Sequence, residues 1–119
     1  MKQEIQVPHK GDIIRLQYIG ANETMEHNAI VLTPSNYNQR LGVMRCSPIN
    51  SEQTQTQGLF VALANYANIQ GAVDCRYVNT VNLYSPYYQY RHIGTVPDIL
   101  LNEILARIVS PYNLPIAFV

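Results

Sequence analysis

Short runs of alternating apolar and polar residues fill most of the chain, and polar, turn-rich stretches separate them. Residues 12–18 alternate with Ile14, Leu16 and Tyr18 on one face, which is typical of a half-buried β-strand. The same pattern predicts further short strands at residues 29–33, 43–47, 59–63, 71–78 and, as a candidate sixth, 80–85. Five or six short strands with turn signals between them favour a small curled barrel.

Two stretches between these strands lack the strand pattern. Residues 20–28 are polar and rich in turn-forming residues, so we expect a loop there. Residues 35–42 predict a short helical turn or loop that ends at Gly42. The long polar segment after residue 50 is expected to be a loop as well.

A strong helical pattern occurs near the end of the chain, from about Pro97 to Val109. Thr95 and Asp98 have the spacing of a capping box, and Pro97 lies near the first turn, where a missing N–H costs no hydrogen bond. The helix carries a broad apolar stripe, formed by Leu100, Leu101, Ile104, Leu105 and Ile108. Such a stripe is suited to packing on a barrel or on a partner.

Length and composition indicate one globular domain. The chain has 119 residues, of which 47% are hydrophobic and 13% charged. We expect a barrel over about 8–90, the helix over about 96–109 and an apolar tail, 111–119, that docks on the protein. No apolar run is long enough to span a membrane and the N-terminus lacks the apolar core of a signal peptide, so we expect a cytoplasmic protein without membrane contact.

Charge and cysteine content narrow the classes of partner and site. Eight basic and eight acidic residues give a net charge of zero, which argues against binding long duplex through many phosphate contacts but leaves a small basic site open. Cys46 and Cys75 lie in apolar, strand-like runs without metal-ligand spacing around them. Buried free thiols are therefore favoured over a disulfide or a metal site, and we expect no metal and no cofactor.

Five segments follow one another in an order and spacing that are more specific than any one of them. They read PHKGDIIRLQY, NAIVLTPSNYN, GVMRCSPINS, QGAVDCRYVNTVNL and VPDILLNEILARIVSPYN. This order resembles the MazF/PemK/Kid family of toxins from toxin–antitoxin systems. The family's P-x-x-G-[DE]-I opening is matched at residues 8–13, its R-P-A block resembles residues 27–38, and its C-terminal helix resembles residues 96–108. The likeness extends to Tyr112.

The resemblance implies a mainly β protein with a C-terminal helix, an SH3-like barrel of the MazF/Kid/CcdB toxin fold, which forms a homodimer. Most members are metal-independent endoribonucleases, or mRNA interferases, that cut single-stranded RNA at short sequences and inhibit growth. A cognate antitoxin protein blocks their RNA groove. CcdB has the same fold and poisons DNA gyrase instead, so the fold by itself does not determine the activity.

Three hypotheses about function follow from the resemblance. The first is a toxin of a type II system that cleaves RNA by attack of the ribose 2′-hydroxyl. The alternative is a catalytically altered member that acts by binding, for example as a CcdB-like gyrase inhibitor. A plain SH3-like module that binds peptides through its tyrosines is the third, and it accounts least well for the ordered motifs.

The family's catalytic arginine is replaced here by His27, and Asn28 follows it in place of proline. A histidine titrates near neutral pH and can serve as acid or base, so the replacement would change the mechanism without abolishing it. The alternative interpretation, a loop histidine in a degenerate site, remains open.

The fifth predicted strand carries Asp74-Cys75-Arg76, in which the charged residues of the R-C-D sequence of Kid-type members have changed places. Because Asp74 and Arg76 flank one residue, we expect both side chains on the same face of the strand. They form either a catalytic pair, with a base beside a phosphate clamp, or a structural ion pair of little energetic value.

The family's catalytic Ser/Thr position, at the end of the third strand, corresponds to Asn50-Ser51. Both residues can donate to a phosphate oxygen, although both are also common in ordinary turns. Arg45 precedes them on the same strand and shares a face with Ser47. It is expected either to contact a phosphate or to cap a sheet edge.

Aromatic residues gather in the last part of the barrel, where five of the nine tyrosines lie between Tyr77 and Tyr90. Beside arginine and histidine, tyrosines can stack on unpaired bases, each worth about 1–3 kcal/mol, without a high net charge. They are equally typical of a protein interface. The RNA-binding candidates are Tyr77, Tyr87, Tyr88, Tyr90, Arg91 and His92.

Overall fold

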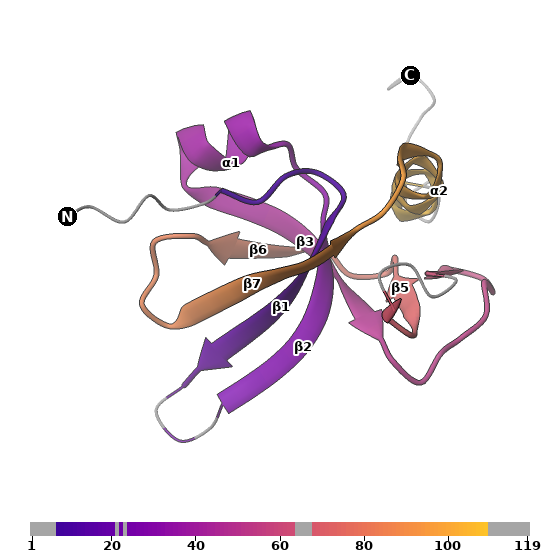
Figure 1. Cartoon of the computed structure of the whole chain (residues 1–119), viewed down its shortest axis with the longest axis horizontal. Helices are drawn as coiled ribbons and strands as arrows, with labels where there is room; N and C mark the ends of the chain where they lie inside the picture. Colours follow the sequence, from indigo (N-terminus) through magenta and orange to yellow (C-terminus); the bar gives the residue numbers. More distant parts are fainter. Residues whose placement is uncertain (1–6, 21, 23, 64–67, 110–119) are drawn as a thin grey trace.

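The computed structural model describes residues 7–20, 22, 24–63 and 68–109, which form an antiparallel sheet with two helices (Figure 1). The elements in chain order are β1 (Asp12–Ile19), β2 (Thr24–Val31), α1 (Ser35–Leu41), β3 (Val43–Asn50), β4 (Phe60–Ala62), β5 (Ala72–Asp74), β6 (Asn79–Asn82), β7 (Tyr88–Thr95) and α2 (Asp98–Val109). The expected mainly β fold with a C-terminal helix is confirmed.

Strand β3 organises the sheet. One of its edges pairs with β2, while its other edge pairs first with β6 and then, at Ile49 and Asn50, with β5. The path through the sheet is β4-β5-β3-β2-β1-β7. The sheet curls into a barrel-like shape. Among the described residues no ladder joins β6 to β7, so this shape is open between these two strands.

The central strands bury both of their faces. On β1, Ile13 belongs to a cluster under α2, whereas its neighbour Ile14 belongs to a second cluster on the opposite face. Leu101 and Ile104 of α2 are buried in the first cluster, and the rest of the predicted stripe packs against it. The helix therefore covers one end of the curled sheet, beside β5 (Figure 1), and it spans Asp98–Val109, close to the predicted range.

Two predictions about local structure are wrong, and one strand was not predicted. The supposed loop at 20–28 contains the first half of β2, whose polar side chains pair with β1 on an exposed face and so hide the alternation. Strand β5 ends at Asp74 instead of residue 78. The segment 88–95, for which no strand was predicted, is strand β7, which pairs with β1 along its length and contains no fully buried residue. The 111–119 tail lies outside the described residues.

Both cysteines are buried free thiols, as predicted. Cys46 lies in the cluster with Ile14, and Cys75 lies in the cluster with Ile13. Burial raises the pKa of Cys46 to about 12 and that of Cys75 to about 11. Neither thiol is therefore suited to be a nucleophile at neutral pH. No helix in the described part of the chain is long and apolar enough to cross a membrane.

Asn38 is fully buried at the junction of α1 with the N-terminal segment. Its side-chain amide donates hydrogen bonds of 2.9 Å to the carbonyl oxygens of Pro8 and Thr33, and its Oδ1 accepts one of 2.6 Å from the Thr33 hydroxyl. The chain then leaves α1 at Gly42, whose φ of 69° suits glycine. A Cβ there would also come within 2.6 Å of the Tyr84 ring.

We expect Asn38→Ala to lower the free energy of unfolding by about 2–4 kcal/mol, because it leaves buried carbonyl groups without a donor. Urea unfolding measures this change. The matched control is Asn36→Ala, since Asn36 lies on the same helix and is exposed. Equal effects of the two variants would contradict the role assigned to Asn38.

Candidate functional site

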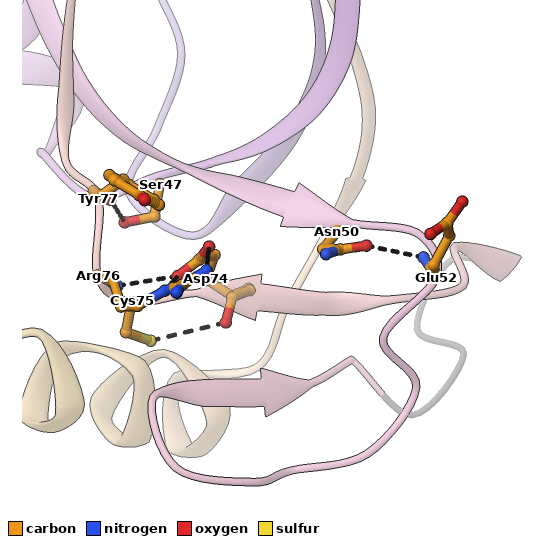
Figure 2. Close-up of polar contacts among 8 residues, drawn as sticks. Ser47, Asn50, Glu52, Asp74, Cys75, Arg76 and Tyr77 are labelled. Atoms are coloured by element: carbon orange, nitrogen blue, oxygen red, sulfur yellow. Dashed lines mark hydrogen bonds and ion pairs between the residues drawn. The ribbon is translucent and has the colours of Figure 1, made fainter.

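The end of β5 holds an arginine in a fixed position. Arg76 donates from Nε to Asp74 Oδ1 at 2.9 Å and from Nη2 to Asp74 Oδ2 at 2.8 Å (Figure 2). The Asp74 side chain is 9% exposed and that of Arg76 is 50% exposed. The hydrogen bond from Arg76 holds the pKa of the Asp74 carboxyl below its usual range, so the carboxylate is ionised at neutral pH.

The two residues meet for a different reason than the sequence suggested. Arg76 lies in a turn beyond the end of β5, so the expectation of a shared strand face is wrong. The contact comes from the turn itself, in which the backbone N–H of Arg76 also donates to Asp74 Oδ1 at 3.1 Å. Because both carboxylate oxygens of Asp74 accept from Arg76, the geometry suits a carboxylate that positions the arginine better than it suits a general base.

Two aromatic rings complete the setting of Arg76. Its guanidinium carbon lies 5.1 Å from the centroid of the Phe60 ring and 5.3 Å from that of the Tyr77 ring. Both distances fall within the range of cation–π attraction. Phe60 carries no signal of this role in the sequence, because its position depends on the register in which β4 pairs Phe60 with Asp74.

His27 lies in a hollow next to this arginine turn. The hollow measures about 650 Å³ and is lined by Met25, Glu26, His27, Pro48, Tyr77 and Asn79. We call it the His27 hollow. Partial burial lowers the pKa of His27, so its imidazole is neutral at pH 7. Tyr77 borders the hollow and also contacts the Arg76 guanidinium, so it connects the two groups.

Ser47 fixes the backbone that carries Tyr77. Its side chain is buried and its hydroxyl donates to the carbonyl oxygen of Tyr77 at 2.8 Å (Figure 2). Arg45, two residues earlier on β3, is exposed and pairs with Thr80 of β6 through the backbone register. The structure therefore places Arg45 beside the Tyr77 segment, outside the residues that line the His27 hollow.

Asn50 and Ser51 lie at the other end of β5 from Arg76. Asn50 is the register partner of Ala72, at the start of β5, whereas Asp74 ends that strand. The Oδ1 of Asn50 accepts a hydrogen bond of 2.9 Å from the backbone N–H of Glu52, which forms an Asx-turn (Figure 2). Both Asn50 and Ser51 are exposed, so their side chains can still reach a bound strand.

The remaining RNA-binding candidates lie across β1 from the His27 hollow. Tyr88 contacts Tyr18, with ring centroids 5.3 Å apart, and Tyr87 is exposed in the preceding turn. Tyr90, Arg91 and His92 border a separate hollow of about 960 Å³, together with Val7, Pro8, His9, Asp12, Ile14 and Thr95. The structure thus brings Asp74, Arg76, Tyr77 and His27 together and places the β7 residues apart.

The arginine turn and the His27 hollow supply two of the groups that RNA cleavage needs. A neutral imidazole can take the proton of a ribose hydroxyl, and a fixed guanidinium can stabilise negative charge on a phosphate. In the described part of the chain, no group of three or more His, Cys, Asp or Glu side chains is placed to hold a metal ion.

Comparison with known proteins identifies the fold. No protein-family model and no curated protein matches the sequence. Among solved structures, MazF from Deinococcus radiodurans superposes with a TM-score of 0.76 at 21% identity, over 92% of this chain and 100% of that one. A MazE–MazF complex from the same organism gives 0.75 at 22% identity, over 90% and 97% of the two chains. A mycobacterial endoribonuclease gives 0.70 at 13% identity, over 95% and 98%. The MazF-type fold expected from the sequence is therefore confirmed.

Proposed function

We propose that this protein is the toxin of a type II toxin–antitoxin system and that it cleaves single-stranded RNA at short sequences without a metal ion. The observation that carries the proposal is the Arg76 guanidinium, held half-exposed by Asp74 and two rings beside a hollow that contains a neutral His27. The likeness of the fold to a mycobacterial endoribonuclease supports the same class of reaction.

In the proposed reaction His27 takes the proton of the ribose 2′-hydroxyl, and that oxygen attacks the adjacent phosphorus. The bond to the 5′-oxygen breaks, and this leaving group takes a proton from solvent, so the products end in a 2′,3′-cyclic phosphate and a 5′-hydroxyl. Arg76 stabilises the negative charge that develops on the phosphate oxygens. Asp74 positions Arg76, and Asn50 and Ser51 donate to the phosphate or to the next nucleotide.

RNA recognition is proposed to involve the exposed residues around these groups. Tyr77 borders the His27 hollow, so it offers a ring on which a base next to the cleaved bond can stack. Arg45 contacts a phosphate farther along the strand. Tyr87, Tyr88, Tyr90, Arg91 and His92 lie on or next to β7 and would contact nucleotides more distant from that bond.

The proposed partners follow from the solved neighbours of the fold. One of these is a complex of MazE with MazF and another is an endoribonuclease with its cognate antitoxin. We propose that a cognate antitoxin protein likewise binds this chain, that the active form is a cytoplasmic homodimer, and that the free toxin inhibits growth.

A binding protein without ribonuclease activity, such as a CcdB-like gyrase inhibitor, is the second candidate. The observation in its favour is that the Asn50 side chain is engaged in a turn and both Asp74 oxygens are engaged by Arg76. In that case His27 would be only a half-buried histidine, and Asp74 with Arg76 would be a structural ion pair.

The test is incubation of the purified protein with a long single-stranded RNA in EDTA. We expect cuts at a few short sequences, with cyclic-phosphate ends at each cut. Intact RNA at high protein concentration would contradict the ribonuclease proposal, and inhibition of gyrase supercoiling by the same preparation would then support the second candidate.

A further inference from the structure

A polar array covers the exposed face of the sheet formed by β2, β1 and β7. In one row Arg15 is the register partner of both Asn28 and Arg91, and in the next row Gln17 is the partner of both Glu26 and Gln89. Register partners and residues two apart on a strand share a face, so all six side chains lie on one side of the sheet. We call these six residues the outer polar array.

The two arginines of the array differ in their hydrogen bonds. Arg15 donates to the Glu26 carboxylate and, at 3.2 Å from Nη1, to Asn28 Oδ1. Its charge is thereby partly neutralised. Arg91 is exposed and makes no hydrogen bond or ion pair with any residue that the structure describes.

The position of Arg91 is unfavourable for the isolated protein. Like charges directly opposite each other on neighbouring strands destabilise a sheet, and Arg91 stands directly opposite Arg15. Real proteins break such local rules mainly at functional sites. A guanidinium that has no partner among the described residues, beside two amide side chains, fits an anion with several acceptor oxygens, because guanidinium and amide N–H groups are all donors.

The array is connected to the proposed cleavage site. A hollow of about 260 Å³ is lined by Arg15, Gln17, Glu26, Gln89, Tyr90 and Arg91. Glu26 borders this hollow and also the His27 hollow. Glu26 is therefore common to the two hollows, with His27 and the array on opposite faces of β2.

We propose that the outer polar array binds a backbone phosphate of single-stranded RNA, a few nucleotides away from the bond that is cleaved. This inference rests on the proposed function, since it names a further contact for the same substrate. Arg91 provides the charged contact, and the amides of Gln17 and Gln89 donate to the same phosphate or to the adjacent sugar. The negative charge of Glu26 repels a second anion, so the array binds one phosphate.

The test compares Arg91→Gln with the unchanged protein in binding a labelled single-stranded RNA whose 2′-hydroxyls are all methylated, so that it cannot be cut. Fluorescence anisotropy at several salt concentrations gives affinity and salt dependence. We expect affinity to fall about tenfold and the salt slope to fall by about 0.7, which is the value for one phosphate contact on a single strand.

Two further measurements separate binding from a structural role. Arg91→Gln should unfold at the same temperature as the unchanged protein or at a higher one, because it removes a like-charge pair. Arg40→Gln is the matched control, since Arg40 is exposed on α1, and it should leave the salt slope unchanged. An unchanged slope in Arg91→Gln, equal effects of both variants, a lower unfolding temperature or an altered oligomeric state would each overturn the inference.

The inference and the proposed function can fail separately. If the protein cuts RNA but the salt slope does not depend on Arg91, the array is not a subsite and the ribonuclease proposal stands. If it cuts no RNA but binds it through Arg91, the array stands as a site for single-stranded RNA and the ribonuclease proposal fails. If the methylated RNA does not bind at all, the inference is overturned.

Discussion

His27→Ala should lower the rate constant of RNA cleavage by about 10²–10⁴-fold, the usual contribution of a positioned general base. The imidazole is neutral at pH 7 because burial lowers its pKa, and it lies in the hollow beside Tyr77. Single-turnover cleavage of a short RNA that contains one mapped site measures the rate constant directly, without contributions from product release.

His9→Ala is the matched control for this variant. His9 is exposed and lies outside the residues that border the His27 hollow. We expect its rate constant to equal that of the unchanged protein. A His27→Ala variant that is folded and cuts RNA at the unchanged rate would exclude His27 as the base and leave it as a half-buried histidine.

The pH dependence provides an independent check on the same group. Because the pKa of His27 is below its usual value near 6.5, the cleavage rate should rise with pH, with the midpoint of the rise below about pH 6.5, and then level off at higher pH. Stability should change in the same direction. The unfolded chain binds the proton more tightly than the folded protein, so stability is lost as pH falls below about 6.5. His27→Ala should lack both dependences, which pH–rate profiles and urea unfolding at several pH values would measure.

The sequence predicts the central strands and α2 better than the strands with exposed polar side chains. α2 was predictable because its apolar stripe and its start and stop signals agree, and the order of the five motifs indicated the fold. β7 was not predictable, because it lies at the edge of the sheet and exposes arginine, histidine and glutamine side chains. The first half of β2 was missed for the same reason, since its outward residues interact with Arg15 and not with a core.

The candidate site was predicted residue by residue but not as an arrangement. Asp74 and Arg76 were identified together. Their contact, however, depends on a turn that begins directly after Asp74, the last residue of β5. Phe60 supplies a ring under Arg76 only because of the register between β4 and β5, which no local pattern reveals. The position of Arg91 directly opposite Arg15 became visible only in the register between β1 and β7.

Arg76→Ala is expected to lower the cleavage rate constant by about 10²–10³-fold, which is typical of removing a group that stabilises charge in the transition state. Asp74→Asn should have a smaller effect, about tenfold, since it keeps the shape of the side chain but loses the ion pair that orients Arg76. Arg40→Ala is the control, because Arg40 is exposed on α1 and lies outside the residues that line the His27 hollow, and its rate constant should be unchanged.

The double variant distinguishes positioning from direct catalysis. If Asp74 acts only by orienting Arg76, Asp74→Asn should have no further effect once Arg76 is alanine, because there is no guanidinium left to orient. If Asp74 is itself the base, its replacement should slow cleavage by a similar factor in both backgrounds. The lowered pKa of the Asp74 carboxyl and the engagement of both its oxygens by Arg76 favour the first outcome, since such a carboxylate is a weak proton acceptor. If Asp74→Asn lowers the rate constant by the same factor with Arg76 present and with Arg76→Ala, the base is Asp74 and not His27.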